Sequence, residues 1–114
     1  MELVARERCG DLVVRIEEVR IDAAVAVRFK DEMRARSSGA HPRVILDLSR
    51  VEFLDSSGLG AVVAVLKEVT PEKALALAGL TPNVQKVFRL TRMDTVFTIF
   101  ADVESAFVGV AHAS

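Results

Sequence analysis

The sequence predicts an α/β domain with a mixed β-sheet of about five strands and about four helices. Short segments rich in Val, Leu and Ala alternate along the chain with segments of helical period, and turn residues separate them. No internal repeat or linker interrupts this alternation. The 114 residues can bury one hydrophobic core and not two, so we expect a single domain over residues 1–114, with residues 111–114 as a frayed tail. Strand order does not follow from these patterns.

The chain begins with a predicted β-hairpin. Leu3 to Cys9 and Leu12 to Ile16 are β-prone, and Gly10-Asp11 suits a two-residue turn between them. In the second segment the residues of one face are all apolar, whereas the other face carries a charged residue. This pattern is typical of a sheet covered mainly on one side. Three further strands are expected. They are Val44 to Leu48, in an interior position because the run is continuously apolar, Ala74 to Ala78, and Val96 to Phe100.

Capping residues and apolar spacing predict the helices. Asp22 stands as N-cap of a first helix from Ala23, and Thr81-Pro82 opens a third. A second, buried helix is expected over Leu59 to Leu66, with Ser56 or Ser57 as its N-cap. Asp102 is expected to cap a final helix that has Val103, Phe107 and Val110 on one side.

The bulk composition excludes several classes of protein. The formal charge is −1, with 15 basic residues scattered among 16 acidic ones. The protein is therefore expected to have no positive electrostatic field that would attract nucleic acid or an anionic membrane. No apolar run approaches the ~18 residues that span a bilayer, so we expect no membrane insertion and a cytoplasmic location. Cys9 is the only cysteine, which rules out an intramolecular disulfide, and we expect its thiol to be buried.

The sequence does not indicate an enzyme, a metal centre or a cofactor site. His41, His112 and Cys9 do not cluster at ligand spacing, and His41 is expected at the end of its strand opposite Ser57. The serines lack the Gly-x-Ser-x-Gly pattern of hydrolases and a histidine that could take the proton. A dinucleotide fingerprint is also incomplete, because Val63 stands where a third glycine is needed.

The most informative stretch is Asp55-Ser56-Ser57-Gly58-Leu59-Gly60, which connects a strand region to a helix. The glycines are expected to permit a tight turn and close packing of the helix on the sheet. A helix N-terminus at the edge of an α/β sheet is exposed and electrically suited to an anion, so a phosphate on a serine would be tolerated there, although Asp55 would repel it. The residues alone leave two interpretations open: the serine only caps the helix, or it also receives a phosphate.

The residues from Val44 to Gly60, ending in Asp-Ser-Ser-Gly-Leu-Gly, resemble the signature of the STAS domain family, specifically the bacterial anti-sigma-factor antagonists, or anti-anti-sigma factors. Ile21-Asp22 is similar to the family's Gly-x-Leu-Asp before the first helix, and Leu80 to Phe88 to its third-helix entry. Val19 stands where the family usually has glycine, and the preceding loop is one residue longer than usual. The resemblance extends over nearly the whole chain and implies a single STAS-like domain.

The resemblance also implies a site and partners. In the family the second hydroxyl residue of Asp-Ser-Ser-Gly is phosphorylated, which corresponds to Ser57 rather than Ser56. The implied partners are an anti-sigma-factor serine kinase of the GHKL type and a metal-dependent serine/threonine phosphatase that reverses the modification. The residues implied to surround the phosphosite and bind the partner are Asp22, Asp55, Ser56, Gly58, Leu59 and Gly60.

The leading hypothesis is therefore a non-enzymatic switch that binds the kinase when unphosphorylated and releases it when Ser57 is phosphorylated. The alternative is a STAS scaffold or regulatory subunit, within a stress-signalling assembly or a lipid-transport ATPase complex. An enzyme with Ser57 as nucleophile would need a base that the sequence does not supply.

Overall fold

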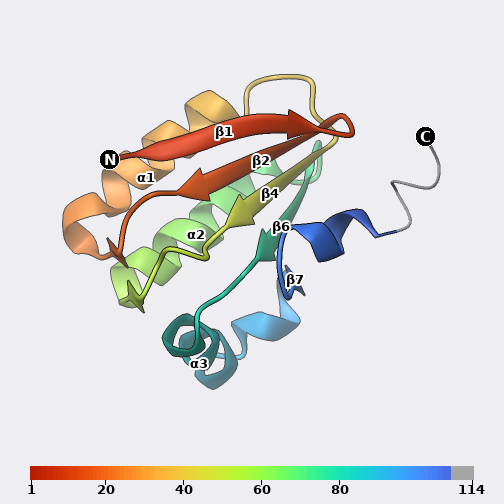
Figure 1. The fold of residues 1–114 in the computed structure, drawn as a ribbon. Helices are drawn as coiled ribbons and strands as arrows, with labels where there is room; N and C mark the ends of the chain where they lie inside the picture. The colour runs from red at the N-terminus through yellow and green to blue at the C-terminus, as the bar shows by residue number, and fades with distance from the viewer. Residues whose placement is uncertain (109–114) are drawn as a thin grey trace.

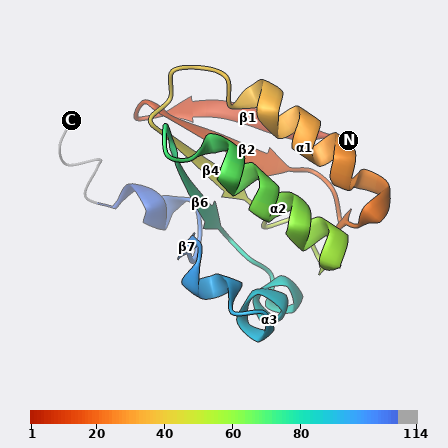
Figure 2. The same ribbon diagram turned by 180° about the vertical axis from the view of Figure 1, so that it is seen from behind.

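The computed structural model describes residues 1–108, which form an open five-stranded sheet with two long helices on one face (Figures 1 and 2). The strand order is β1-β2-β4-β6-β7. Only the β1–β2 pair is antiparallel, so the sheet is mixed, as predicted. The strands are β1 (Leu3–Arg8), β2 (Asp11–Ile16), β4 (Arg43–Asp47), β6 (Ala74–Ala78) and β7 (Thr98–Phe100).

The turn of the opening hairpin lies one residue earlier than predicted. Cys9 and Gly10 form it, with φ angles of 52° and 85°, whereas Asp11 already belongs to β2. Positive φ at both central residues is the requirement of a type I′ turn, whose twist matches that of the flanking strands. This position at the tip of the hairpin leaves Cys9 exposed, so the prediction of a buried thiol is wrong.

Strand β4 lies in the middle of the sheet, as its continuous apolar sequence predicts. Val44 and Leu46 face the main core, while Ile45 between them belongs to a second cluster on the other face. Both faces of β4 are therefore covered, which explains why apolar residues do not alternate with polar ones along it.

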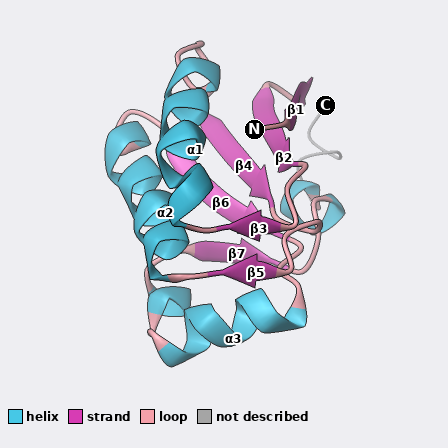
Figure 3. Ribbon diagram, turned by 90° about the vertical axis from the view of Figure 1, so that its left-hand side faces the viewer, coloured by secondary structure: helices cyan, strands magenta, loops and turns pink. Residues whose placement is uncertain are grey.

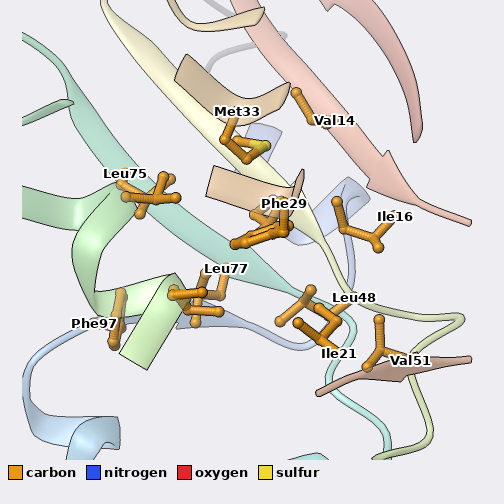
Figure 4. Packing of buried hydrophobic residues seen from close by; sticks show 14 of the residues in the cluster. Val14, Ile16, Ile21, Phe29, Met33, Leu48, Val51, Leu75, Leu77 and Phe97 are labelled. Carbon is orange, nitrogen blue, oxygen red and sulfur yellow. The ribbon is translucent and has the colours of Figure 1, made fainter. Parts of the chain in front are cut away.

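The part of the chain that the structure describes has three α-helices, of which the first and the third begin where they were predicted. They are α1 (Ala23–Arg36), α2 (Ser56–Val69) and α3 (Pro82–Leu90), and α2 extends beyond the predicted Leu59 to Leu66 at both ends. The main core lies between the sheet and these helices, and Figure 4 shows side chains of β2, α1 and β6 meeting there, among them Ile16, Phe29 and Leu77. Within residues 1–108, no helix has the length and apolar character needed to cross a membrane.

The C-terminal part differs from the prediction. Met93–Thr95 form the 3-10 helix η1, so β7 is shorter than expected. After β7 the structure has a short 3-10 helix, η2 (Glu104–Phe107), in place of a final α-helix. The Asp102 carboxylate does accept a hydrogen bond from the Ser105 N–H, at 2.8 Å. Val110, His112 and the expected tail lie outside the described residues. The expectation of about four helices is thus corrected to three α-helices and two 3-10 helices within residues 1–108.

Helix η2 covers part of the sheet face opposite α1 and α2. Phe107 and Ala106 are buried there in the second cluster, together with Val13, Ile45, Ala76 and Ala78. The guanidinium carbons of Arg8 and Arg43 lie 4.4 and 5.2 Å from the centroid of the Phe107 ring. Arg8 also donates two hydrogen bonds of 2.8 Å to the Glu104 carboxylate. Apolar burial and paired charges together hold η2 on the sheet.

Candidate functional site

Two helix N-termini start side by side from a small second sheet. Strands β3 (Arg20–Ile21) and β5 (Phe53–Leu54) pair in parallel, and Figure 3 shows them adjacent to each other. Asp22 follows β3 and caps α1, and Asp55 follows β5 and caps α2. Because paired parallel strands run in the same direction, both caps lie at the same edge. Neither β3 nor β5 is among the strands expected from the sequence, so this small sheet was not predicted.

Asp55 is the N-cap of α2, and the prediction that Ser56 or Ser57 caps it is wrong. The Asp55 carboxylate accepts a hydrogen bond from the Gly58 N–H at 2.8 Å, and its backbone carbonyl accepts one from the Leu59 N–H at 2.8 Å. A carboxylate here also gains from the positive end of the helix dipole, which a neutral serine does not. The cap therefore begins one residue before the serines.

Ser56 and Ser57 occupy the first two positions of α2 and are exposed. Neither hydroxyl forms a hydrogen bond with any of residues 1–108. Because the Asp55 carboxylate meets the capping requirement of the helix, neither serine hydroxyl is needed as a cap. The structure thus removes the reason for interpreting these serines as caps alone.

The two glycines of the motif differ in their surroundings. Gly58 is buried, and a Cβ atom built on it would lie 2.0 Å from the Ile21 carbonyl oxygen and 2.9 Å from Leu54 Cδ1. The close packing predicted for Gly58 is therefore confirmed, and it joins α2 to β3. Gly60 is exposed, and a Cβ atom there would meet nothing within 4 Å. The predicted packing role of Gly60 is wrong.

The remaining predicted residues divide between the surface and the core. Asp22 caps α1 as predicted, because its carboxylate accepts a hydrogen bond from the Ala24 N–H at 3.1 Å. Leu59 is half-buried and packs against the main core. Gly60 is three residues after Ser57, so the two share one exposed face of α2. The structure therefore places Asp22, Asp55, Ser56 and Ser57 at the paired helix starts.

Arg20 and Phe53 also belong to this edge, although neither is among the predicted site residues. Both are exposed, and the Arg20 guanidinium carbon lies 4.5 Å from the centroid of the Phe53 ring. Arg20 Nε is 3.6 Å from Asp22 Oδ2. A repeated sequence pattern could have pointed to them. An exposed residue, a buried residue and a capping aspartate precede a helix twice, in Arg20-Ile21-Asp22 and in Phe53-Leu54-Asp55.

The groups considered for metal or acid-base chemistry do not assemble at this edge. His41 lies just before β4 begins, at the end of that strand opposite the serines, as expected. Its Nε2 atom is 3.4 Å from Glu7 Oε1, and its Nδ1 atom is buried without a hydrogen-bond partner among residues 1–108. Across the part of the chain that the structure describes, no three His, Cys, Asp or Glu residues are grouped as metal ligands.

Comparison with known proteins identifies the fold. The family model described as the STAS domain matches residues 2–106. BtrV of Bordetella bronchiseptica, named as a candidate anti-sigma factor antagonist, is 29% identical over 93% of this chain and 91% of its own length. An anti-sigma factor antagonist of Mycobacterium paratuberculosis has a similar structure, with a TM-score of 0.85, 24% identity and coverage of 96% of this chain and 93% of that one.

The fold also matches a structure of the Bacillus cell fate determinant SpoIIAA in its phosphorylated form. The TM-score is 0.68 at 21% identity, and the match covers 96% of this chain and 99% of SpoIIAA. The family model and the relatives extend over nearly the whole chain, including the Asp-Ser-Ser-Gly edge. The chain therefore belongs to the STAS domain family, and its relatives of similar length carry the name anti-sigma factor antagonist.

Proposed function

We propose that this protein is an anti-sigma-factor antagonist that works as a phosphorylation switch. Unphosphorylated, it binds an anti-sigma-factor serine kinase of the GHKL type through the Ser57 loop and the exposed face of α2, with Asp22 and Gly60 in the contact. The kinase transfers the γ-phosphoryl group of ATP to Ser57 Oγ and leaves ADP, and the complex then dissociates. A metal-dependent serine/threonine phosphatase hydrolyses the phosphate and restores binding. The names of the relatives support the antagonist role.

The observation that carries this proposal is the free hydroxyl group of Ser57. It is exposed and unbonded within residues 1–108 because Asp55 already caps the helix. A kinase needs a hydroxyl that can enter its active site, and a switch needs a site whose modification leaves the fold intact. The phosphate would sit at the positive end of α2, where negative charge is tolerated. Phosphorylation therefore changes the surface without unfolding the protein.

The phosphate can break the complex by electrostatics alone. It adds about −1.5 to −2 charges beside the carboxylates of Asp22 and Asp55. At the centre of a packed interface such a charge is repelled or incompletely paired, which costs about 4 kcal/mol, or roughly a thousandfold in affinity. No change of backbone conformation is needed for this loss.

The test is phosphorylation by the cognate kinase, which a gene neighbouring that of this protein should encode. The purified protein is mixed with the kinase and ATP, and the phosphate is mapped by mass spectrometry. We expect one phosphate on Ser57, none in Ser57→Ala, and unchanged modification in the matched control Ser56→Ala. Modification that persists in Ser57→Ala would refute the site.

Co-purification from cells separates the switch from the scaffold alternative. Recovery of a GHKL-type kinase whose binding is lost on phosphorylation supports the switch. Recovery of a lipid-transport ATPase in its place would favour a regulatory subunit.

A further inference from the structure

Arg20 is held loosely at the edge of the protein that carries Ser57. Its side chain is 62% exposed, stacks on Phe53 with 4.5 Å between guanidinium carbon and ring centroid, and lies 3.6 Å from Asp22 Oδ2. Its guanidinium group donates no hydrogen bond within residues 1–108. An exposed ion pair at this distance contributes little to stability, so a stronger anion nearby can displace Asp22.

The backbone brings Arg20 close to Ser57. Asp55 N donates to the Ile21 carbonyl at 3.4 Å, and a Cβ atom on Gly58 would lie 2.0 Å from the same oxygen. Ile21 and Gly58 therefore touch, and Arg20 and Ser57 are the residues just before them. Because consecutive Cα atoms are about 3.8 Å apart, a phosphate on Ser57 falls within reach of the long arginine side chain.

The charges at this edge favour such a contact. The carboxylates of Asp22 and Asp55 are each held at this edge by a backbone N–H of the helix that they cap. A phosphate on Ser57 would therefore face two anions. A phosphate carries more charge than Asp22 and offers three acceptor oxygens in a geometry that the planar guanidinium group can bind with two hydrogen bonds. Arg8 already binds the Glu104 carboxylate in this two-bond manner.

We propose that Arg20 is the internal counter-cation of the phosphate on Ser57, which it binds after leaving Phe53 and Asp22. The inference rests on the proposed function, because it concerns the modified form of Ser57. Phosphorylation then changes three features of the partner surface together: it adds the phosphate, uncovers one face of the Phe53 ring, and frees the Asp22 carboxylate from its cation. Arg20 is a positioning residue in this scheme, since the chemical step belongs to the kinase.

The experiment installs phosphoserine at position 57 during translation, so that no kinase is required. The second pKa of the phosphate is measured by 31P NMR titration in the otherwise unchanged protein and in Arg20→Gln, Arg20→Lys and Arg36→Gln. Arg36 is the matched control, because it is exposed in the last turn of the 14-residue helix α1, about 20 Å from its start. Circular dichroism of each protein confirms that it is folded.

A nearby cation favours the doubly charged phosphate, so we expect Arg20→Gln to raise this pKa by about half a unit or more. Arg20→Lys should retain part of the effect, and Arg36→Gln should leave the value unchanged. Equal pKa values in the unchanged protein and in Arg20→Gln would overturn the proposal, as would equal shifts in Arg20→Gln and Arg36→Gln. Neither outcome depends on the kinase experiment, so failure of this inference and failure of the proposed function are distinguishable.

Discussion

The Asp55 carboxylate accepts a hydrogen bond of 2.8 Å from the Gly58 N–H, so one residue closes the first turn of α2 and leaves both adjacent serines unbonded within residues 1–108. The same turn rests on β3, because Gly58 lies against the Ile21 carbonyl group. The position of Ser57 relative to Asp22 therefore depends on two contacts of Gly58, neither of which involves the serine side chain.

Removal of the cap should destabilise the protein, whereas removal of either serine hydroxyl should not. We expect Asp55→Ala to lower the free energy of unfolding by about 1 kcal/mol, the usual cost of losing an N-cap. Ser56→Ala and Ser57→Ala should each change it by no more than about 0.5 kcal/mol, because neither hydroxyl is bonded. Urea denaturation provides the measurement, and a loss in Ser57→Ala equal to that in Asp55→Ala would contradict the assignment of the cap.

Substitution by alanine should change the free energy of unfolding in opposite directions at the two motif glycines. Gly58→Ala places a methyl group against backbone, and we expect a loss of about 3 kcal/mol or more in unfolding free energy. Gly60→Ala meets open space on an exposed helix face and should gain up to about 1 kcal/mol. If Gly60 lies in the kinase interface, the same variant should bind the kinase more weakly although it is more stable, and calorimetric titration would show this. Unchanged affinity in Gly60→Ala would remove Gly60 from the interface.

The sequence predicts the large elements of this fold well because their patterns are long. Strand β4 is recognised as a continuous apolar run, and the start of α3 is recognised from the proline at its first position. The two-residue strands β3 and β5 are too short to show a period, so the sheet that pairs the helix starts could not be predicted. Three consecutive residues, Asp55 to Ser57, can all cap a helix, and only the geometry selects the first. Val103 and Phe107 fit an α-helical spacing, but η2 is a short 3-10 helix packed on the sheet.

Loss of the Phe107 ring should release η2 from the sheet. Phe107 is buried among Val13, Ile45 and two alanines, with Arg8 and Arg43 over its ring, so Phe107→Ala should cost about 3 kcal/mol or more. Phe107→Leu, which keeps most of the buried volume, should cost less. Thermal and urea denaturation measure both variants. Kinase binding should be unchanged in the folded variants, because η2 covers the sheet face opposite α2; weaker binding in folded Phe107→Leu would indicate a larger interface.

The Arg8–Glu104 pair should make stability depend on pH in the acid range. The hydrogen bonds from Arg8, and then its charge, hold the pKa of Glu104 below its ordinary value of 4.5. The unfolded chain therefore binds this proton more readily than the folded one, and stability rises with pH. The contribution is fully present above about pH 4.5 and is lost as the pH falls through the lowered pKa of the folded protein.

Glu104→Gln should therefore be less stable than the unchanged protein at pH 6, and this difference should shrink as the pH falls towards 3. The measurement is the free energy of urea unfolding at half-unit intervals of pH. Glu72→Gln is the matched control, because Glu72 is exposed and forms no ion pair within residues 1–108. Both variants remove one carboxylate, so they share any effect of net charge, and only Glu104→Gln removes the contact with Arg8. An equal dependence on pH in the two variants would show that the acid-range slope comes from net charge and not from the pair that fastens η2.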